Sequence, residues 1–208
     1  MAGSLITFFI FFELLTLSTW PLVVHKQDAK SLAAGRSYLA FALPGSAALL
    51  VAIVWLESAT GPVEFARPPD LSVLPDASLR WIFALFIAGL GVKAALVPLH
   101  GWLPGAMAAP APVSALLHAV AAVKAGAFGV VRVVYDVFGI ASIQELGVGT
   151  PLALLASVTI LWGSLRALQQ DEIKKRLAFS TVSQVSYIVL GAALAGPYAT
   201  IGGLAHLV

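Results

Sequence analysis

Ionisable side chains stand inside otherwise apolar segments of this chain at four positions, namely Glu13, Lys93, His118 and Lys124. On insertion scales, an acidic or basic residue at the centre of a bilayer costs about 2.5–3.5 kcal/mol, so such residues usually face a bundle interior or a wet cavity and mark ion or proton pathways. Burial also disfavours the charged form of a carboxyl or ammonium group, which brings its proton exchange closer to neutral pH. These residue types therefore predict proton transfer.

The alternative for each charge is a position near the membrane surface. A lysine stem is long enough to carry its ammonium group to water. This alternative is stronger for Lys93, five residues before Pro98, than for Lys124, which lies deeper in its segment. A glutamate in the middle of FFIFFELLTLSTWPL is too short to reach water, so Glu13 is predicted to face the bundle. If Glu13 and Lys93 lie close together, breaking their ion pair would release a proton.

The histidines have weaker signals. His118 lies six residues before Lys124, so the two side chains point to different faces of a helix. A neutral imidazole can pass protons at physiological pH, and a structural histidine bonded to backbone is the alternative. His100 is expected to cap or hydrogen-bond carbonyls freed by a helix break. No carboxylate or thiolate accompanies the histidines at ligand spacing, so no metal site is expected.

Prolines interrupt the segment between the two lysines, at Pro98, Pro104, Pro110 and Pro112. Each lacks a backbone donor and breaks helix. Broken backbone at membrane depth is tolerated only where it is buried in protein or lines a water-filled cavity. Discontinuous helices of this kind recur at transport sites, with an ordinary surface loop as the alternative.

The composition places the elements that carry these residues in a membrane. Hydrophobic residues make up 60% of the chain and charged residues 11%, against about 25% charged in soluble domains. The net charge of +2 is scattered and predicts no nucleic-acid partner. The chain has no cysteine and no GxGxxG, so no iron–sulfur cluster, flavin or nicotinamide is expected here. Any redox activity would belong to partner subunits.

The expected fold class is all-α, a polytopic transmembrane helix bundle of about six to seven spans with one broken helix. The expected spans are 4–24, 38–56, 81–98 with a break over 98–111, 112–131, 149–165, 177–195 and an incomplete 198–208. Because the chain ends within an apolar run, we expect it to be a fragment of a longer reading frame.

The loops predict an orientation. If every span crosses, loops 25–37, 98–111 and 166–176 share one side, and loops 57–80 and 132–148 share the other. The first side carries seven basic residues: Lys26, Lys30, Arg36, Arg166, Lys174, Lys175 and Arg176. The second side carries three, diluted by acidic residues: Arg67, Arg80 and Arg132. The positive-inside rule then places the first side in the cytoplasm and the N-terminus outside. The membrane is expected to be a bacterial inner membrane.

Three stretches carry a family resemblance: VKAALVPLHGWLPGAMAAPAPVSALLHAVAAVKAG, FFELLTLSTWPLVVHKQ and DEIKKRLAFSTVSQVSYIVLG. They resemble the antiporter-like membrane subunits of respiratory complex I (NADH:quinone oxidoreductase), of Mrp-type cation/proton antiporters and of membrane-bound hydrogenases. The final GGLAHLV resembles the start of that family's next lysine helix.

The resemblance implies roles and a fold. Glu13 is implied as the channel glutamate, Lys93 as its partner on the broken helix, His118 as a connecting histidine and Lys124 as a further relay lysine. The implied fold is two inverted five-helix repeats, of which this chain holds most of the first and part of the second. The implied partners are other membrane subunits, lipid, and protons, with sodium left open.

The function expected from sequence is proton translocation along a buried Glu/Lys/His axis within a multisubunit complex. Two alternatives remain: a structural membrane subunit whose buried charges are fixed ion pairs, and a standalone secondary transporter for a small solute. Respiratory complex, hydrogenase and Mrp antiporter are not separated by the residues, although FELLTLSTWPLVVHKQ leans toward the Mrp side.

Overall fold

A computed structural model describes residues 3–117 and 122–207, and this part of the chain is helical, as the sequence predicted. Its elements are α1 (Leu5–Val23), α2 (Ala29–Thr60), η1 (Leu71–Val73), α3 (Asp76–Lys93), η2 (Leu99–Gly101), α4 (Trp102–Ala106), α5 (Ala111–Ala115), α6 (Ala122–Arg132), η4 (Val133–Phe138), α7 (Gly139–Glu145), α8 (Gly149–Leu168), α9 (Ile173–Leu194) and α10 (Pro197–Leu207).

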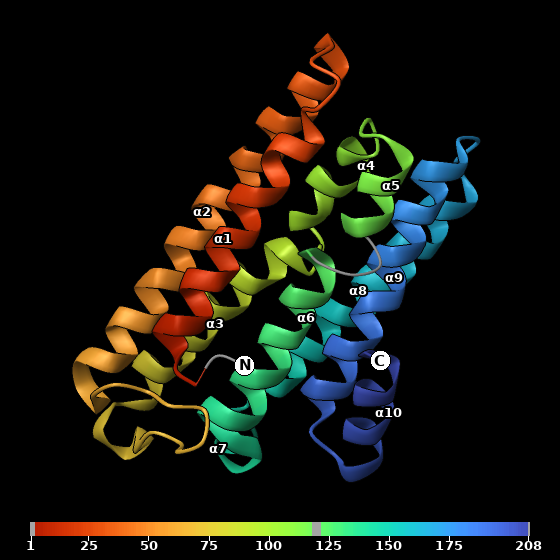
Figure 1. The fold of residues 1–208 in the computed structure, drawn as a ribbon. Helices are drawn as coiled ribbons and strands as arrows, with labels where there is room; N and C mark the ends of the chain where they lie inside the picture. Colours follow the sequence, from red (N-terminus) through yellow and green to blue (C-terminus); the bar gives the residue numbers. More distant parts are fainter. Residues whose placement is uncertain (1–2, 118–121, 208) are drawn as a thin grey trace.

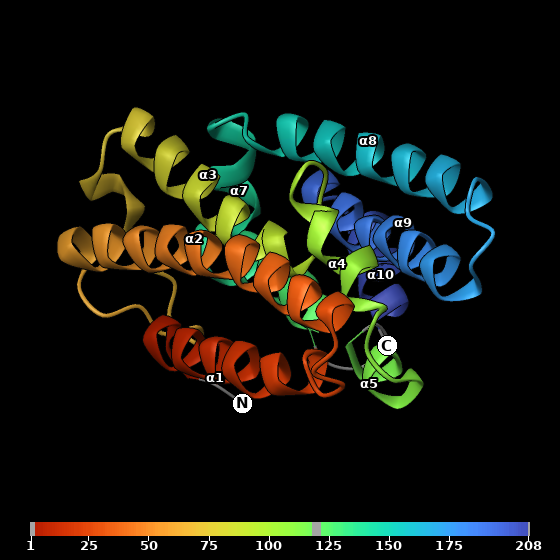
Figure 2. The ribbon, with the colours of Figure 1, turned by 90° about the horizontal axis from the view of Figure 1, so that it is seen from above.

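The long helices form two antiparallel hairpins with shorter helices between them. Helices α1 and α2 pair on one flank and α8 and α9 on the other, while α3 and α6 pack against each other in the middle (Figure 1). Helix α10 packs against α9. Seen from above, α2 lies between α1 and α3 (Figure 2). The site described below lies where α1, α2, α3 and α6 meet.

Local signals explain where the first two helices begin. The Ser4 hydroxyl accepts a hydrogen bond from the amide of Thr7 (3.2 Å), and the Asp28 carboxylate accepts one from the amide of Ser31 (2.6 Å). Both are N-cap interactions that satisfy donors left free in the first turn of a helix. The caps set where α1 and α2 start and therefore the height at which their side chains face one another.

Helices α2 and α3 approach closely because glycines face each other. A Cβ atom placed on Gly89 of α3 would lie 2.7 Å from the carbonyl oxygen of Gly45 on α2. Small residues allow such backbone contact between helices, and van der Waals packing then holds the pair together. This contact brings the next residue of α2, Ser46, close to the last turn of α3.

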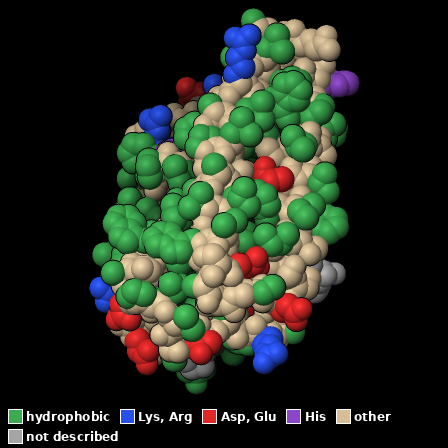
Figure 3. Space-filling view, turned by 90° about the vertical axis from the view of Figure 1, so that its left-hand side faces the viewer, with side chains coloured by type: hydrophobic (Ala, Val, Ile, Leu, Met, Phe, Trp, Pro, Cys, Tyr) green, Lys and Arg blue, Asp and Glu red, His purple; other side chains and the backbone are tan. Residues whose placement is uncertain are grey.

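In the part of the chain that the structure describes, five helices are long and apolar enough to cross a membrane, beginning at Leu5, Ala29, Ala122, Gly149 and Ile173. Helix α3 carries Asp76, Arg80 and Lys93, and α10 has only 11 residues. Large exposed hydrophobic side chains cover the flanks of the bundle, as Figure 3 shows for one face. The protein is thus an integral, multi-pass membrane protein.

The predicted boundaries of the third and fourth spans differ from the structure. Helix α3 covers 76–93 rather than 81–98, because the chain turns at Ala95, whose φ is 56°. Within the expected span 112–131, α5 ends at Ala115, residues 116–117 are π-helical, and α6 covers the described residues from Ala122. Hydropathy alone does not register these turns, since the residues that make them are themselves apolar.

The connections gather at two ends of the bundle, as the loop analysis predicted. Residues 24–28, 98–111 and 169–172 lie at the upper end in Figure 1, here called the basic end, and residues 61–75, 146–148 and 195–196 lie at the lower end. Acidic side chains gather at the lower end of the face in Figure 3.

Candidate functional site

The centre of the site is an ion pair between α1 and α3. The Nζ atom of Lys93 lies 3.9 Å from Oε1 of Glu13. The Lys93 side chain is 2% exposed and that of Glu13 is 21% exposed. The charge of the Lys93 ammonium group is therefore stabilised by protein groups rather than by water. The two residues that stood out as isolated charges in the sequence are therefore in contact.

Lys93 has further partners on α1. Its ammonium group donates a hydrogen bond to the carbonyl of Phe12 and lies 3.4 Å from the centroid of the Phe12 ring. A cation over an aromatic face is attracted by the negative charge of the π system, most strongly when desolvated. Lys93 is also the last residue of α3, where the dipole of the helix favours a cation. These contacts explain how an ammonium group is accommodated among apolar side chains.

Glu13 is held by a residue that the sequence analysis missed. The hydroxyl of Ser46 on α2 donates a 2.6 Å hydrogen bond to Oε1 of Glu13, the same oxygen that faces Lys93. Hydrogen bonds to an ionised acceptor are shorter and stronger than neutral ones. The sequence signal for this contact is the pair of small residues Gly45-Ser46 in the middle of an apolar helix, which marks a face packed against another helix.

Three hydrogen bonds tie the broken segment after α3 to α3 itself, to α8 and to α9. The indole of Trp102 donates to the carbonyl of Val92 (2.7 Å), and the amide of Val97 donates to the Thr159 hydroxyl on α8 (3.1 Å). The ammonium group of Lys174 donates to the carbonyl of Ala109 (2.9 Å). Irregular backbone at membrane depth needs such partners. The broken segment is therefore an ordered structure that fixes the position of the end of α3.

The prolines and His100 occupy defined places around the break. Pro98 precedes η2, Pro104 lies within α4, and Pro110 and Pro112 begin α5, where a missing amide donor costs little. His100 differs from its expected capping role: its Nε2 accepts a hydrogen bond from the Trp162 indole (3.2 Å). Its Nδ1 atom is buried without a hydrogen-bond partner in the described part of the chain.

Lys124 lies apart from the ion pair. Its ammonium group is half-buried and donates to the carbonyl of Leu207 on α10 (2.9 Å). Among the residues described, no ion pair or hydrogen bond joins it to Glu13 or Lys93. It therefore ties α6 to α10, on the other side of α6 from α1. His118 lies outside the described residues.

Close packing of α6 holds the end of α3 in place. A Cβ atom on Gly126 would lie 2.3 Å from the amide nitrogen of Ala94 and 2.7 Å from the carbonyl carbon of Lys93. Only hydrogen fits at this position without moving one of the helices. The backbone at the end of α3 is thus held by close contact with α6.

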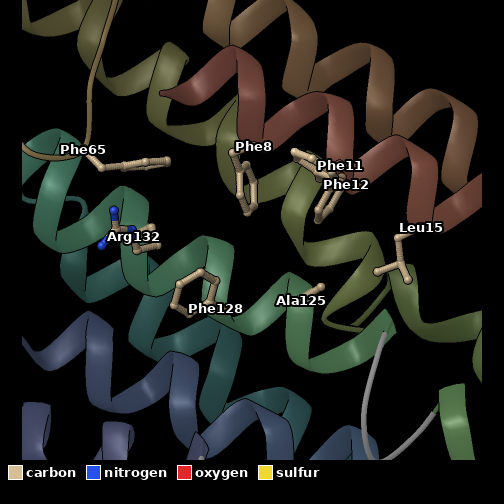
Figure 4. A pocket seen from close by; sticks show the side chains of 8 residues that line it. All are labelled: Phe8, Phe11, Phe12, Leu15, Phe65, Ala125, Phe128 and Arg132. Carbon is tan, nitrogen blue, oxygen red and sulfur yellow. The ribbon is translucent and has the colours of Figure 1, made fainter. Parts of the chain in front are cut away.

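An aromatic cleft borders the ion pair. The cleft has a volume of about 510 Å³ and lies between α1 and α6, with phenylalanines from both sides pointing into it (Figure 4). Phe12, which carries the contacts to Lys93, is in its wall. At the other end Arg132 pairs with Asp136 (2.9 Å) and lies over the Phe65 ring. The apolar wall screens the Lys93 ammonium group from this direction.

The fold and the site define a class: polytopic membrane proteins with a buried ion pair beside an interrupted helix. The chain belongs to the NADH:quinone oxidoreductase/Mrp antiporter transmembrane family, whose match covers residues 2–208. This confirms the resemblance that the sequence motifs carried.

The chain is similar to subunits of several membrane complexes. It is 37% identical to hydrogenase-4 component B of Escherichia coli (strain K12) over 95% of its length and 30% of that protein. It is 35% identical to NADH-quinone oxidoreductase subunit N of Desulforudis audaxviator (strain MP104C), over 99% of this chain and 41% of that one. The chain thus spans less than half the length of these relatives.

Solved structures share the fold. All of this chain superposes on 42% of a chain in the archaeal membrane-bound sulfane sulfur reductase, with a TM-score of 0.88 and 28% identity. The same TM-score and identity relate it to 22% of a chain in the Mrp complex from Dietzia sp. DQ12-45-1b.

Proposed function

We propose that this chain is the proton-transferring part of a membrane subunit within a multisubunit complex, and that the Glu13–Lys93 pair is its gating element. The observation that carries the proposal is the 3.9 Å contact between two ionisable groups near the middle of a membrane bundle, beside a broken helix. Intramembrane ionisable residues of this kind mark ion and proton pathways.

The pair supplies two states. While Glu13 is ionised and Lys93 protonated, each stabilises the charge of the other. Protonation of Glu13 removes that stabilisation, so the desolvated ammonium group is left to lose its proton to a neighbouring acceptor. The Ser46 hydroxyl group, which is hydrogen-bonded to Glu13, can rotate as the charge of the carboxyl group changes. One proton thus arrives at the glutamate as another leaves the lysine.

Lys124 and His118 are proposed as relay groups beyond the pair. Lys124 contacts α10, which suits transfer away from α1 toward the following helices. The proposed orientation has the basic end in the cytoplasm and the N-terminus outside a bacterial cell membrane. The proposed partners are the other membrane subunits of a respiratory, hydrogenase or Mrp-type complex, as the names of the relatives suggest.

The test uses everted vesicles that carry the full-length protein with its neighbouring subunits. A fluorescent pH probe follows the gradient after addition of NADH, and separately after addition of sodium to energised vesicles. A gradient built by NADH supports a respiratory pump, and one dissipated by sodium supports an antiporter. Lys93→Ala is expected to abolish either response while the complex still assembles.

Normal transport by an assembled Lys93→Ala complex would remove the ion pair from the mechanism and favour a structural subunit. In that case Glu13→Gln should impair assembly and leave transport per assembled complex unchanged. Uptake of a small solute by the purified subunit alone would instead favour a standalone transporter.

A further inference from the structure

Three buried hydroxyl groups line the contact between α1 and α2. They belong to Thr16, Thr19 and Tyr38, and each of these residues is at most 2% exposed. The hydroxyls of Thr19 and Tyr38 are hydrogen-bonded across the two helices at 2.9 Å, and the Tyr38 hydroxyl also faces that of Thr16. We call this set the hydroxyl row. Together with the hydrogen bond from Ser46 to Glu13, the row makes up a polar part of the α1–α2 contact.

The hydroxyl row reaches the ion pair. The Thr16 hydroxyl donates a 3.3 Å hydrogen bond to the carbonyl of Phe12, and the same oxygen accepts the hydrogen bond from the Lys93 ammonium group. Both donors are therefore directed at one carbonyl oxygen, which places this end of the row within reach of the ion pair. Thr16 is also one turn from Glu13 on α1, so both members of the pair are adjacent to this end of the row.

The other end of the row approaches a pocket at the basic end of the bundle. This pocket has a volume of about 260 Å³ and lies between α2, α4 and the start of α9. Polar side chains in its wall are Lys30, Ser37, Glu172 and Lys175. A water molecule occupies about 30 Å³ in the liquid, so the pocket has room and hydrogen-bonding partners for several.

The pocket lies next to Tyr38. Ala34, in the pocket wall, is one helical turn before Tyr38 and on the same face of α2. Trp102, whose ring centroid lies 5.1 Å from that of Tyr38, is followed closely in the chain by Pro104 and Gly105, which also line the pocket. The pocket wall therefore includes residues within one helical turn of Tyr38 along α2.

We propose that the hydroxyl row of Thr16, Thr19 and Tyr38 is the route by which protons reach Lys93 from the pocket at the basic end. This inference rests on the proposed function, because it assigns a path to the proton that the ion pair handles. A proton from water binds the Tyr38 oxygen as the phenolic proton passes to a threonine oxygen, which in turn releases its own proton toward the unprotonated Lys93 amine. Each hydroxyl ends with one proton and resets by rotation.

Removing the hydroxyls tests the route. In the full-length protein within its complex, Tyr38→Phe keeps the ring against Trp102, and Thr19→Val keeps the side-chain volume. We expect both variants to slow proton transport at least several-fold, measured with the pH probe and normalised to the amount of assembled complex. Thr19→Ser, which restores a hydroxyl, should recover most of the rate. Tyr198→Phe and Ser18→Ala, which alter exposed hydroxyls, are matched controls expected at the wild-type rate.

A second readout tests access from the pocket. The chain has no cysteine, so Ser37→Cys introduces one thiol into this part of the protein, in the wall of the pocket. A bulky, membrane-impermeant thiol reagent added to everted vesicles should then block transport, and the same reagent should leave the complex without that substitution active.

The outcomes separate the two proposals. If Lys93→Ala is inactive while assembled Tyr38→Phe and Thr19→Val complexes transport at the wild-type rate, the route is overturned and the proposed function stands. If Lys93→Ala transports normally, the proposed function fails, and the route fails with it because its end point is Lys93. Slow transport by the row variants, with recovery in Thr19→Ser and reagent block of Ser37→Cys, supports both.

Discussion

The amide of Leu96 donates a 2.9 Å hydrogen bond to the carbonyl of Gly91, and this contact makes Lys93 the last residue of α3. A second bond runs from the amide of Ala95 to the carbonyl of Val92 (3.2 Å). Together with the positive φ of Ala95 these bonds form a Schellman motif, which ends a helix and satisfies its last carbonyls. The position of the ammonium group opposite Glu13 follows from this turn.

Ala95 is expected to be strained, since glycine is the usual residue at this position of the motif. A left-handed conformation costs an L-residue roughly 1–2 kcal/mol, whereas loss of one buried methyl group costs about 0.8 kcal/mol. Ala95→Gly should therefore leave the free energy of unfolding unchanged or raise it by up to about 1 kcal/mol. Ala95→Val should lower it clearly, because a β-branched side chain fits this conformation poorly. Thermal unfolding of the purified protein in detergent measures both, and a less stable glycine variant would contradict the strain argument.

Ser46→Ala should remove the hydrogen bond that holds the Glu13 carboxyl group in place, without removing the charge of Glu13. Hydrogen bonds between membrane helices contribute about 0.6 kcal/mol on average and up to about 1.7 kcal/mol, so a small fall in the unfolding temperature is expected. Proton transport should slow but persist, because the ion pair with Lys93 remains. Ser58→Ala, at an exposed hydroxyl of the same helix, is the control. Equal transport rates in the two variants, measured in everted vesicles, would show that Ser46 does not position the glutamate.

Gly126→Ala should displace the end of α3. The added methyl group would meet backbone atoms of Lys93 and Ala94, which cannot rotate away, and overpacking of this kind typically costs 1–3 kcal/mol. We expect both a lower unfolding temperature and slower transport per assembled complex, because the ammonium group moves with the backbone. Gly202→Ala, where a Cβ atom meets nothing within 4 Å, should leave transport unchanged and should not lower the unfolding temperature. If the Gly126→Ala variant is as stable as the wild type, α6 can move away from α3 without strain.

Asp28 should make the stability of α2 depend on pH. Hydrogen bonds from the amide and the side chain of Ser31 lower the pKa of the Asp28 carboxyl group below its ordinary value of 3.8. Since the folded pKa is the lower one, the stabilisation is present above about pH 4 and is lost as the pH falls through the folded pKa. Asp28→Asn keeps a capping side chain that does not titrate. Unfolding temperatures measured from pH 6 to pH 3 should therefore fall less in the variant than in the wild type, and parallel curves would contradict this.

The sequence by itself determined the membrane environment of this protein and singled out its buried charged residues. Runs of about 20 apolar residues require helices in a membrane, because no other structure spanning lipid satisfies its own backbone. An isolated charge such as Glu13 within such a run is costly, so its presence indicates a functional role. The prolines after Lys93 require a break in the helix. These inferences hold without a fold because each depends on a residue and its neighbours along the chain.

Only the tertiary structure decided which groups meet. Glu13 and Lys93 are 80 positions apart in the sequence, and Lys124 and Leu207 are 83 apart, so no local pattern reports their contacts. The end of α3 at Lys93 was also misplaced from sequence, because the turn at Ala95 is made by an apolar residue that hydropathy cannot distinguish from helix. Hydropathy records the cost of leaving water, whereas the partners of a buried polar group are set by helix packing, here by the close approach at Gly45, Gly89 and Gly126.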